Sequence, residues 1–495
     1  MRRAYQVEAV RAAERALLAQ LPDGTLMNRA AAGLAAVCGS LLARDPGHVY
    51  GARIVILAGS GDNGGDALYA GARLARRGAA VTAIIATAKA HAGGAAALRA
   101  AGGRITDDPD AIARADLIVD GLLGIGGRGG LREPFAGLAA AAEQARQNQA
   151  TVVAVDLPSG IDADTGAVDG PAVRADVTVT FGAIKPGLLV DPGAGHAGTV
   201  ELVDIGLGGQ LSGEPAVMAP QRDDIAALLP RPGPESDKYR RGVVGVLAGS
   251  DRFAGAAVLA AGGAVRGGAG MVRVVTGTVP AAAVRQAWPE AVLTVYPQDD
   301  PGWDLTGDVG RVQAWVAGPG MGTDPAAAAR LAAVLATDLP ALVDADGLTI
   351  LSQHQDLLPR RAPTLITPHA GELGRLLGAD PAAVEARRLE HARLAAERLG
   401  LTVLLKGSTT VIASPGEPTV LANPTGTSWL ATAGTGDVLS GLAGALLAQG
   451  LEPAWAAAAA AYLHGLAARL AAAGAPIGAY DVVTALPAAI RAVVD

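Results

Sequence analysis

Short apolar runs separated by longer helical stretches recur along most of the chain. The run Arg53–Ala58 is followed by a glycine-rich turn, an Ala/Leu/Arg stretch to about Arg77, and a second run at Val81–Ile85. This order predicts a strand–helix–strand unit. Three further runs that end in polar or glycine residues extend it: Leu117–Asp120, Val152–Asp156 and Val177–Phe181. Strands separated by helices predict a mostly parallel, buried sheet with ligands at the carboxyl ends of its strands.

The pattern breaks at residues 206–220, which are rich in Gly, Ser, Pro and Glu, and again at the Pro-rich stretch 230–234. We therefore predict two domains, 1–215 and 216–495. The second restarts with a strand at Val243–Ala248, then Gly249-Ser250 and a helix of small residues, and alternates strands and helices to the end. Both domains are expected to be α/β.

Composition narrows the class. The chain of 495 residues is 50% hydrophobic and 18% charged, and its formal net charge of -7 disfavours nucleic acid or an anionic membrane as a partner. A single cysteine, Cys38, permits no internal disulfide. The most membrane-like stretch, Trp455–Ala475, carries His464 and Arg469 and is expected to be a buried helix. We expect a cytoplasmic protein, without membrane association, that acts on small molecules.

The first turn, Gly59–Asp66, has four glycines that allow backbone N–H groups to approach a phosphate. It also contains Asp62, Asn63 and Asp66, whose oxygens suit a hard cation or a ribose. Side chains that merely stabilise a turn remain the alternative. Two more strands end in the same way, at Asp120 before a glycine-rich loop and at Asp156. Three strands that each end in Asp or Asn beside glycine, at one edge of the sheet, favour a ligand-binding site over simple turns.

These motifs, with Leu26-Met27-Asn28-Arg29-Ala30 and Phe181–Gly187, resemble the NAD(P)H-hydrate epimerase family over about residues 1–212. The resemblance implies a three-layer Rossmann-like fold with a K⁺ ion on Asn63, Asp120 and Ser159. It also implies substrate contacts from two loops and one strand end: Asp62, Asn63, Gly64, Gly65 and Asp66; Gly124, Ile125, Gly126, Gly127, Arg128, Gly129 and Gly130; and Asp156.

Two positions depart from that family, which usually has Asn at Asp62 and Gly at Ala67. Asp62 adds negative charge near a dinucleotide, so a non-catalytic binding role of this half remains an alternative. Epimerisation at C6 can proceed through ring opening or through transient loss of the hydroxyl. Both routes need proton transfer, for which Asp156 and Lys185 are the candidate catalytic pair. An ordinary surface lysine is the alternative for Lys185.

In the second half, Ala433–Leu439 opens a helix of small residues. Its backbone N–H groups form an anion hole, and Asp437 is placed to take a proton from a hydroxyl that attacks a phosphoryl group. A helix cap is the alternative for this residue. Other strand ends carry Gly318–Gly322, Asp344–Leu348, Thr367–Glu372 and Leu405–Thr410, the last with a phosphate-binding lysine and hydroxyls.

This set, with Lys238–Gly242 and Gly255–Ala257, resembles the nucleotide-dependent NAD(P)H-hydrate dehydratases of the ribokinase-like fold over about residues 220–495. The resemblance implies that Ala256, Gly322, His369 and Asp437 contact the hydrated nucleotide. It implies adenine-nucleotide contacts from Lys406, Gly407, Ser408, Thr409, Thr410 and Gly436. For His369 a structural histidine is the alternative.

Together the two resemblances imply a bifunctional repair enzyme. One half epimerises the R and S forms of hydrated NADH and NADPH. The other phosphorylates the C6 hydroxyl of the S form with ADP or ATP, with Asp437 as base, and eliminates phosphate. Family resemblance favours ADP, with Mg²⁺ bridging the phosphates; Glu372 is a possible Mg²⁺ ligand. A homo-oligomer is expected. The rival is a ribokinase-like small-molecule kinase with a non-catalytic N-terminal binding domain.

Overall fold

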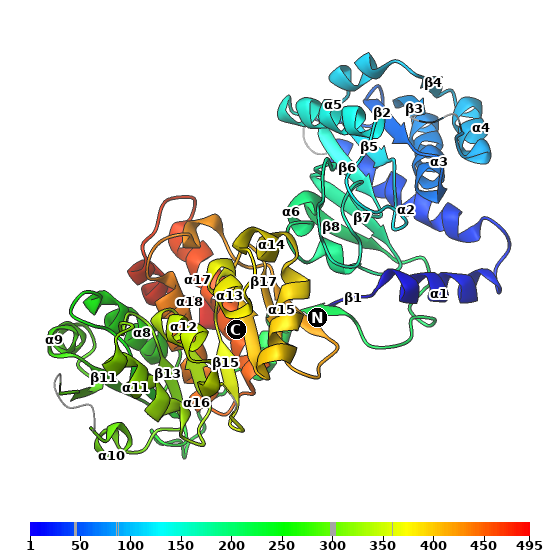
Figure 1. Ribbon diagram of the computed structural model, residues 1–495. Helices are drawn as coiled ribbons and strands as arrows, with labels where there is room; N and C mark the ends of the chain where they lie inside the picture. The colour runs from blue at the N-terminus through cyan, green and yellow to red at the C-terminus, as the bar shows by residue number, and fades with distance from the viewer. Residues whose placement is uncertain (44–46, 86, 88, 298–302, 359) are drawn as a thin grey trace. The chain divides into compact units, whose positions relative to one another are not determined.

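The computed structural model describes residues 1–43, 47–85, 87, 89–297, 303–358 and 360–495 (Figure 1). It divides into two compact units, Arg3–Val217 and Met218–Asp495, the latter joined by Met1–Arg2. The division falls between Val217 and Met218, close to the boundary at 215 that the composition suggested. Each unit is an α/β sandwich with helices on both faces of a sheet, so the predicted fold class is confirmed.

The N-terminal unit is built on seven parallel strands in the order β4-β3-β2-β5-β6-β7-β8. The strands are β2 (Arg53–Ala58), β3 (Ala80–Ile85), β4 (Arg104–Thr106), β5 (Leu117–Gly121), β6 (Thr151–Val155), β7 (Val177–Phe181) and β8 (Thr199–Val203). The chain leaves β2 in one direction for β3 and β4, then returns to β5 on its other side. This reversal opens a crevice at the carboxyl ends of β2 and β5, where doubly wound folds bind ligands.

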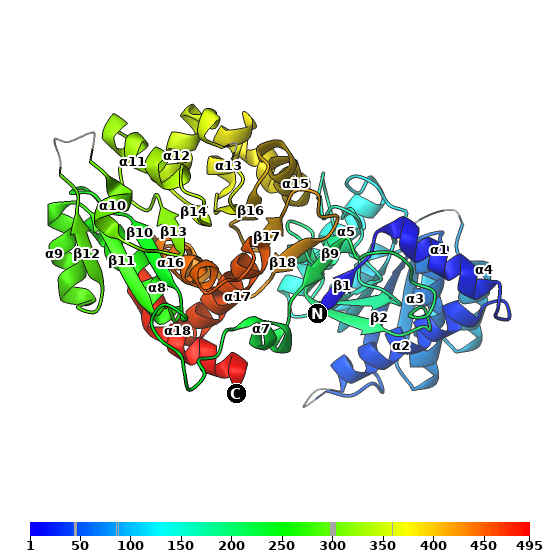
Figure 2. The same ribbon diagram turned by 90° about the horizontal axis from the view of Figure 1, so that it is seen from below.

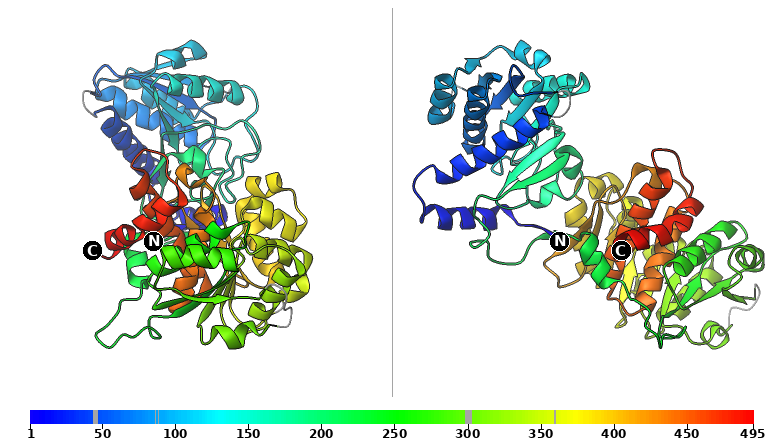
Figure 3. Two further views of the ribbon diagram at one scale, coloured as in Figure 1. Left: turned by 90° about the vertical axis from the view of Figure 1, so that its left-hand side faces the viewer. Right: turned by 180° about the vertical axis from the view of Figure 1, so that it is seen from behind.

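Alternating residues of these strands face two separate cores. Ile54, Ile56 and Ala58 pack against helices α1 to α4, whereas Val55 and Leu57 pack against η1 and α5. Figure 3 shows the helices of this unit around its sheet. The helices of this unit are α1 (Val7–Leu18), α2 (Thr25–Leu42), α3 (Asp62–Arg76), α4 (Ala92–Ala100), η1 (Pro109–Arg114), α5 (Phe135–Gln147), η2 (Pro186–Leu188) and α6 (Ala194–Ala197). Among the described residues, α2 alone is long and apolar enough to span a membrane, and here it contributes to the first core.

The C-terminal unit has a larger sheet in the order β1-β9-β18-β17-β16-β15-β14-β13-β10-β11-β12. Its strands are β1 (Arg2–Ala4), β9 (Val217–Ala219), β10 (Val243–Leu247), β11 (Met271–Thr276), β12 (Val292–Val295), β13 (Ala314–Ala317), β14 (Ala341–Val343), β15 (Thr364–Ile366), β16 (Thr402–Leu405), β17 (Thr410–Ala413) and β18 (Val420–Asn423). From β12 to β16 the pairing is parallel, and β17 and β18 are antiparallel. In this sheet the chain adds β11 and β12 on one side of β10 and then returns to β13 on its other side, so the strand order reverses between β10 and β13.

Helices α8, α16, α17 and α18 cover one face of this sheet, and α11, α12, α13 and α15 cover the other (Figure 2). The predicted buried helix is α17, whose Ala456–Ala461 segment lies in the core. The helices are α7 (Arg222–Leu228), α8 (Ala254–Arg266), α9 (Thr278–Ala287), α10 (Leu305–Val309), α11 (Pro325–Leu335), α12 (Asp346–Gln353), η3 (Gln355–Leu357), α13 (Ala370–Leu377), α14 (Pro381–Ala386), α15 (Arg388–Leu399), η4 (Ser428–Leu430), α16 (Thr435–Ala448), α17 (Pro453–Ala472) and α18 (Ala479–Val494).

Candidate functional sites

A pocket of about 770 Å³ lies at the carboxyl ends of the strands in the N-terminal unit. It is the crevice that the order reversal between β2 and β5 predicts. Of the residues singled out from the sequence, its lining includes Asp62, Asn63, Asp66, Gly124, Ile125, Gly126, Gly127 and Asp156. The chain therefore brings the turn after β2, the loop after β5 and the end of β6 to one cavity.

Gly64 and Gly65 are buried, and Gly64 serves the packing of α3 on the strand before it. A Cβ at Gly64 would lie 2.2 Å from the carbonyl oxygen of Gly59. A Cβ at Gly65 would meet the His91 ring at 3.0 Å. Only glycine allows α3 to start this close to the end of β2. These glycines therefore fix the position of the first turn of α3, which borders the pocket.

The side chains of Asn63, Asp120 and Ser159 are linked beside the loop after β5 through the Leu123 carbonyl. The Ser159 hydroxyl donates to Asp120 at 2.7 Å and lies 3.1 Å from the Leu123 carbonyl, which also accepts from the Asn63 amide at 3.0 Å. Asp120 is fully buried, and burial raises its pKa to about 6 against the hydrogen bonds from Ser159. The described residues hold no cluster of three His, Cys, Asp or Glu side chains suited to a metal ion. Amide, hydroxyl, carbonyl and carboxylate oxygens are instead the donor chemistry of a hard monovalent cation.

Asp156 and Lys185 form a buried ion pair beside the pocket. Asp156 ends β6 with a φ of 64° and also accepts hydrogen bonds from Thr180 Oγ1 and the Phe181 N–H, each at 3.1 Å. The Lys185 side chain is 1% exposed, which excludes the surface lysine considered as its alternative. A backbone in the left-handed region at a non-glycine residue is strain that surrounding structure must hold, and it is found at functional sites.

The structure adds residues to this site that sequence reasoning missed. Arg11 and Glu14 of α1 line the pocket, and burial raises the pKa of Glu14. His91 lines another part, with its Nδ1 accepting from the Gly94 N–H at 3.1 Å. No motif in the sequence identifies Arg11 and Glu14, because α1 has the pattern of an ordinary amphipathic helix. His91 precedes α4 and is not part of a motif either.

The end of the glycine loop lies apart from the pocket. Arg128, Gly129 and Gly130 are absent from its lining, and a Cβ at Gly130 would meet Gly170 at 2.5 Å. Gly130 therefore packs against another backbone segment.

In the C-terminal unit, Asp437 lies in the first turn of α16. Burial and the nearby carboxylates of Asp344 and Asp346 raise its pKa to about 7, opposed by Lys406. The preceding Gly434 adopts a φ of 90°, and the Thr435 carbonyl is bonded to the buried His464 ring at 2.9 Å. A carboxylate tuned near neutral pH at a helix N-terminus is suited to act as a general base.

Lys406 directly follows β16, and its side chain contacts carboxylates that follow the two neighbouring strands β14 and β15. Its Nζ lies 2.8 Å from Asp344, which is 1% exposed and also accepts from the Ser440 hydroxyl at 2.8 Å. Glu372 lies 3.7 Å from the same Nζ. Although burial alone would lower the pKa of Lys406, Asp344 and Glu372 outweigh it and the pKa stands above its ordinary value.

His369 caps α13 and is largely exposed. Its Nδ1 accepts from the Gly371 N–H at 3.0 Å, while Glu372 accepts from the His369 N–H at 2.8 Å. The side chain of His369 is 56% exposed, so a cap and a substrate contact are compatible. Glu372 is buried and already engaged by His369 and Lys406, which argues against it as a magnesium ligand.

Tight backbone contacts shape the rest of this site. Gly318, after β13, has a φ of 128°, and a Cβ there would lie 1.8 Å from the Asp344 carbonyl oxygen. Gly322 donates its N–H to Asp346 at 2.9 Å. Ala256 packs against Gly320: a Cβ added at Gly320 would lie 2.7 Å from the Cβ of Ala256.

Arg388 supports the start of the loop after β16, and its side chain is 1% exposed. Its guanidinium donates to the Lys406 carbonyl at 2.6 Å and to the Leu405 carbonyl at 3.3 Å. Thr409 is buried in this loop and Thr410 begins β17. The loop that contains Gly407 and Ser408 thus returns directly into an antiparallel strand beside the site.

Together these folds and sites define an enzyme that joins a Rossmann-like unit to a ribokinase-like unit. Residues 244–489 match the NAD(P)H-hydrate dehydratase family model, and residues 23–187 match that of the YjeF-related protein N-terminus. The bifunctional NAD(P)H-hydrate repair enzyme Nnr of Mycobacterium tuberculosis is 51% identical over 92% of both chains, and that of Mycobacterium leprae is 49% identical over 96% of this chain and 95% of its own. The chain belongs to the family of bifunctional NAD(P)H-hydrate repair enzymes.

Solved structures agree for the C-terminal unit. The ADP/ATP-dependent NAD(P)H-hydrate dehydratase of Bacillus subtilis, crystallised with ATP and Mg²⁺, is 30% identical, covers 55% of this chain and 97% of its own, and has a TM-score of 0.50. A ribokinase-like protein of Enterococcus faecalis is 26% identical over 56% of this chain and 96% of its own, with a TM-score of 0.51. The curated relatives span both units, which favours the repair enzyme over a small-molecule kinase with a non-catalytic N-terminal binding domain.

Proposed function

We propose that the N-terminal unit interconverts the R and S epimers of hydrated NADH and NADPH and that the C-terminal unit dehydrates the S epimer with ADP. The observation that carries this proposal is the presence of two separate, chemically distinct sites, each at the carboxyl ends of parallel strands in its own sheet. A dehydratase that accepts one epimer leaves the other untouched, so the two activities are useful together.

In the dehydratase unit, Asp437 takes the proton of the C6 hydroxyl as that oxygen attacks a phosphoryl group. Its pKa of about 7 keeps a large fraction ionised at neutral pH. Lys406 and the N–H groups from Gly436 onward neutralise the phosphates, with Gly407, Ser408, Thr409 and Thr410 completing the nucleotide site. Ala256, Gly322 and His369 border the nicotinamide side. Phosphate is a better leaving group than hydroxide, so its departure from C6, together with loss of a proton from C5, restores the C5=C6 double bond of the dihydropyridine ring.

Mg²⁺ would screen the phosphate charges in this unit. The carboxylates at the site are Asp344, Asp346 and Asp437, and Asp344 is already paired with Lys406. The donor chemistry therefore fits a cation held mainly by phosphates.

In the epimerase unit, Asn63, Asp120 and Ser159 fit a K⁺ ion, which would supply positive charge beneath the substrate. Asp62, Asn63, Asp66 and the loop from Gly124 to Gly127 enclose the nucleotide, while Asp156 and Lys185 lie beside them. We further propose a homo-oligomer that acts on small molecules in the cytoplasm, where its nucleotide substrates are kept.

Both activities can be separated in one protein. Given the S epimer and ADP, the full chain is expected to restore NADH absorbance, and given the R epimer it is expected to do so at a rate limited by the N-terminal unit. Asp437→Asn should abolish restoration yet leave interconversion of the epimers, followed by chromatography. Consumption of ADP without restored NADH would contradict the dehydratase assignment.

A further inference from the structure

Asp66 is a buried carboxyl group with an unsatisfied oxygen in the wall of the N-terminal pocket. It lies on α3, is 9% exposed, and its Oδ1 makes no hydrogen bond with any residue that the structure describes. The other two buried carboxylates nearby each have a side-chain partner, Ser159 for Asp120 and Lys185 for Asp156. A buried polar atom without a partner costs folding free energy, and it persists where a ligand or a proton uses it.

The surroundings of Asp66 are strongly acidic. Burial first, and then the carboxylates of Asp156, Asp62 and Glu14, together raise its pKa to about 8. The buried cation at the site, Lys185, is bonded to Asp156. These groups hold a proton on Asp66 at neutral pH, while Asp156 is ion-paired with Lys185. A carboxyl group that keeps its proton beside an ion-paired carboxyl group is an arrangement suited to acid–base catalysis.

We propose that Asp66 is the proton donor of the epimerase reaction and that Asp156 is the matching acceptor, an assignment that rests on the proposed function of the N-terminal unit. The sequence pointed only to Asp156 and Lys185 for this chemistry. In the structure Lys185 is buried and ion-paired with Asp156.

The proposed step is balanced without any further reagent. Asp66 gives its proton to the C6 hydroxyl, the C6–O bond breaks as water leaves, and the N1 lone pair forms the N1=C6 bond. Water then adds to the opposite face of C6 while the N1=C6 pair returns to N1, and the added water gives a proton to Asp156. Water in the pocket carries that proton back to Asp66. The enzyme thus returns to its starting state, and the configuration at C6 is inverted.

This role predicts a pH dependence set by all the charged groups around the pocket. Glu14 and Arg11 face it from α1, Asp62 and Tyr69 from α3, and His91 from the start of α4. Asp156, with Lys185 behind it, completes the wall. Because the acid form of Asp66 is the active one, kcat for epimerisation should fall as pH rises past about 8.

The test is Asp66→Asn in the full chain, which keeps the shape of the side chain and removes its acidic proton. Epimerisation of the R form should lose about 100- to 10,000-fold in kcat. The KM should stay within about threefold of wild type, because the ground-state contacts remain. Dehydration of the S form in the same samples reports that the C-terminal unit is folded and should not change, and the KM for the R form reports the folding of the N-terminal unit.

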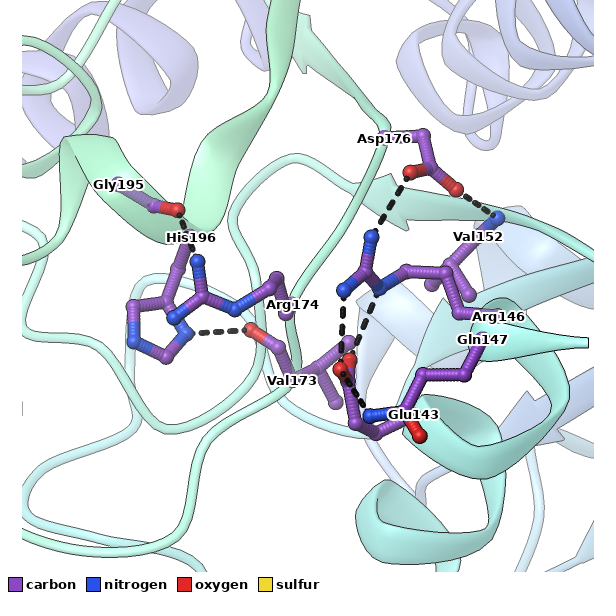
Figure 4. Close-up of polar contacts among 9 residues, drawn as sticks. All are labelled: Glu143, Arg146, Gln147, Val152, Val173, Arg174, Asp176, Gly195 and His196. Carbon is purple, nitrogen blue, oxygen red and sulfur yellow. Dashed lines mark hydrogen bonds and ion pairs between the residues drawn. The ribbon is translucent and has the colours of Figure 1, made fainter. Parts of the chain in front are cut away.

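A matched control is Asp176→Asn. Asp176 belongs to a polar network at the amino ends of β6 and β7, where it bonds Arg146 and the Val152 N–H, and Arg146 keeps Glu143 as a second partner (Figure 4). This variant should epimerise at the wild-type rate.

Each outcome decides a separate question. Wild-type kcat in Asp66→Asn, or a raised KM with unchanged kcat, would overturn the catalytic role and leave the epimerase function intact. A wild-type protein that never converts the R form would overturn the function itself. If Asp66→Asn does not fold, the wild-type profile decides: a kcat that stays constant from pH 7 to pH 9 refutes the proposal.

Discussion

Replacing Asp437 with asparagine should remove dehydratase activity and at the same time stabilise the C-terminal unit. The pKa of Asp437 is raised from 3.8 to about 7, mainly by burial. Since one pKa unit corresponds to about 1.4 kcal/mol, the charged form costs the folded state up to about 4 kcal/mol. Asparagine has the same shape and carries no such cost.

The sign of the effect depends on pH. With a raised pKa, the folded state binds the proton more tightly than the unfolded state, so wild-type stability falls as pH rises from about 4 through about 7. The gain from Asp437→Asn should therefore be about 1–2 kcal/mol at pH 5 and up to about 4 kcal/mol at pH 8.

Tryptophan fluorescence during urea unfolding reports this unit selectively, because every tryptophan of the chain lies beyond residue 217. They are Trp288, Trp303, Trp315, Trp429 and Trp455. The control Asp356→Asn, at an exposed position, should show no such difference between pH 5 and pH 8. An equal gain for Asp437→Asn at the two pH values, or a loss at pH 8, would refute the reasoning.

Three further outcomes are expected. Lys406→Met leaves the buried Asp344 charge without its partner and should lower the free energy of unfolding by about 3–5 kcal/mol, with partial recovery when Asp344→Asn is added, measured as a double-mutant cycle. Ser159→Ala should raise the K⁺ concentration for half-maximal epimerase activity about tenfold in a KCl titration; an unchanged value would remove Ser159 from the cation site. Gly64→Ala should cost the N-terminal unit about 1–3 kcal/mol, seen by circular dichroism, because its Cβ would lie 2.2 Å from Gly59 O.

The sequence predicts the central strands of the N-terminal sheet closely. The runs at 53–58, 117–120 and 177–181 lie within one residue of β2, β5 and β7. Buried parallel strands consist of uninterrupted apolar residues, so their ends are visible as the first polar or glycine residue. Edge strands such as β4 and β8 were not predicted, since the burial pattern of β8 is mixed and β4 has only three residues.

The site was predictable only where its residues follow strand ends. Asp156, Asp120 and Lys406 were all identified in that way, and the structure places each at a carboxyl end. Glu14 was not, because it reaches the pocket from a helix whose docking is a tertiary event. Nor can a sequence show which of several carboxylates lacks a partner, and it is this property that separates Asp66 from its neighbours.

The contact between Gly318 and the Asp344 carbonyl has a consequence for judging the sequences of relatives. The gap is too small for any side chain, since even a methyl group would overlap the oxygen at 1.8 Å, and the left-handed backbone there disfavours every other residue. A natural variant with a larger residue at this position would displace Asp344 and, through it, Lys406. Such a chain would have an inactive second half even though every chemically reactive residue was retained, so this glycine is a marker for recognising degenerate copies.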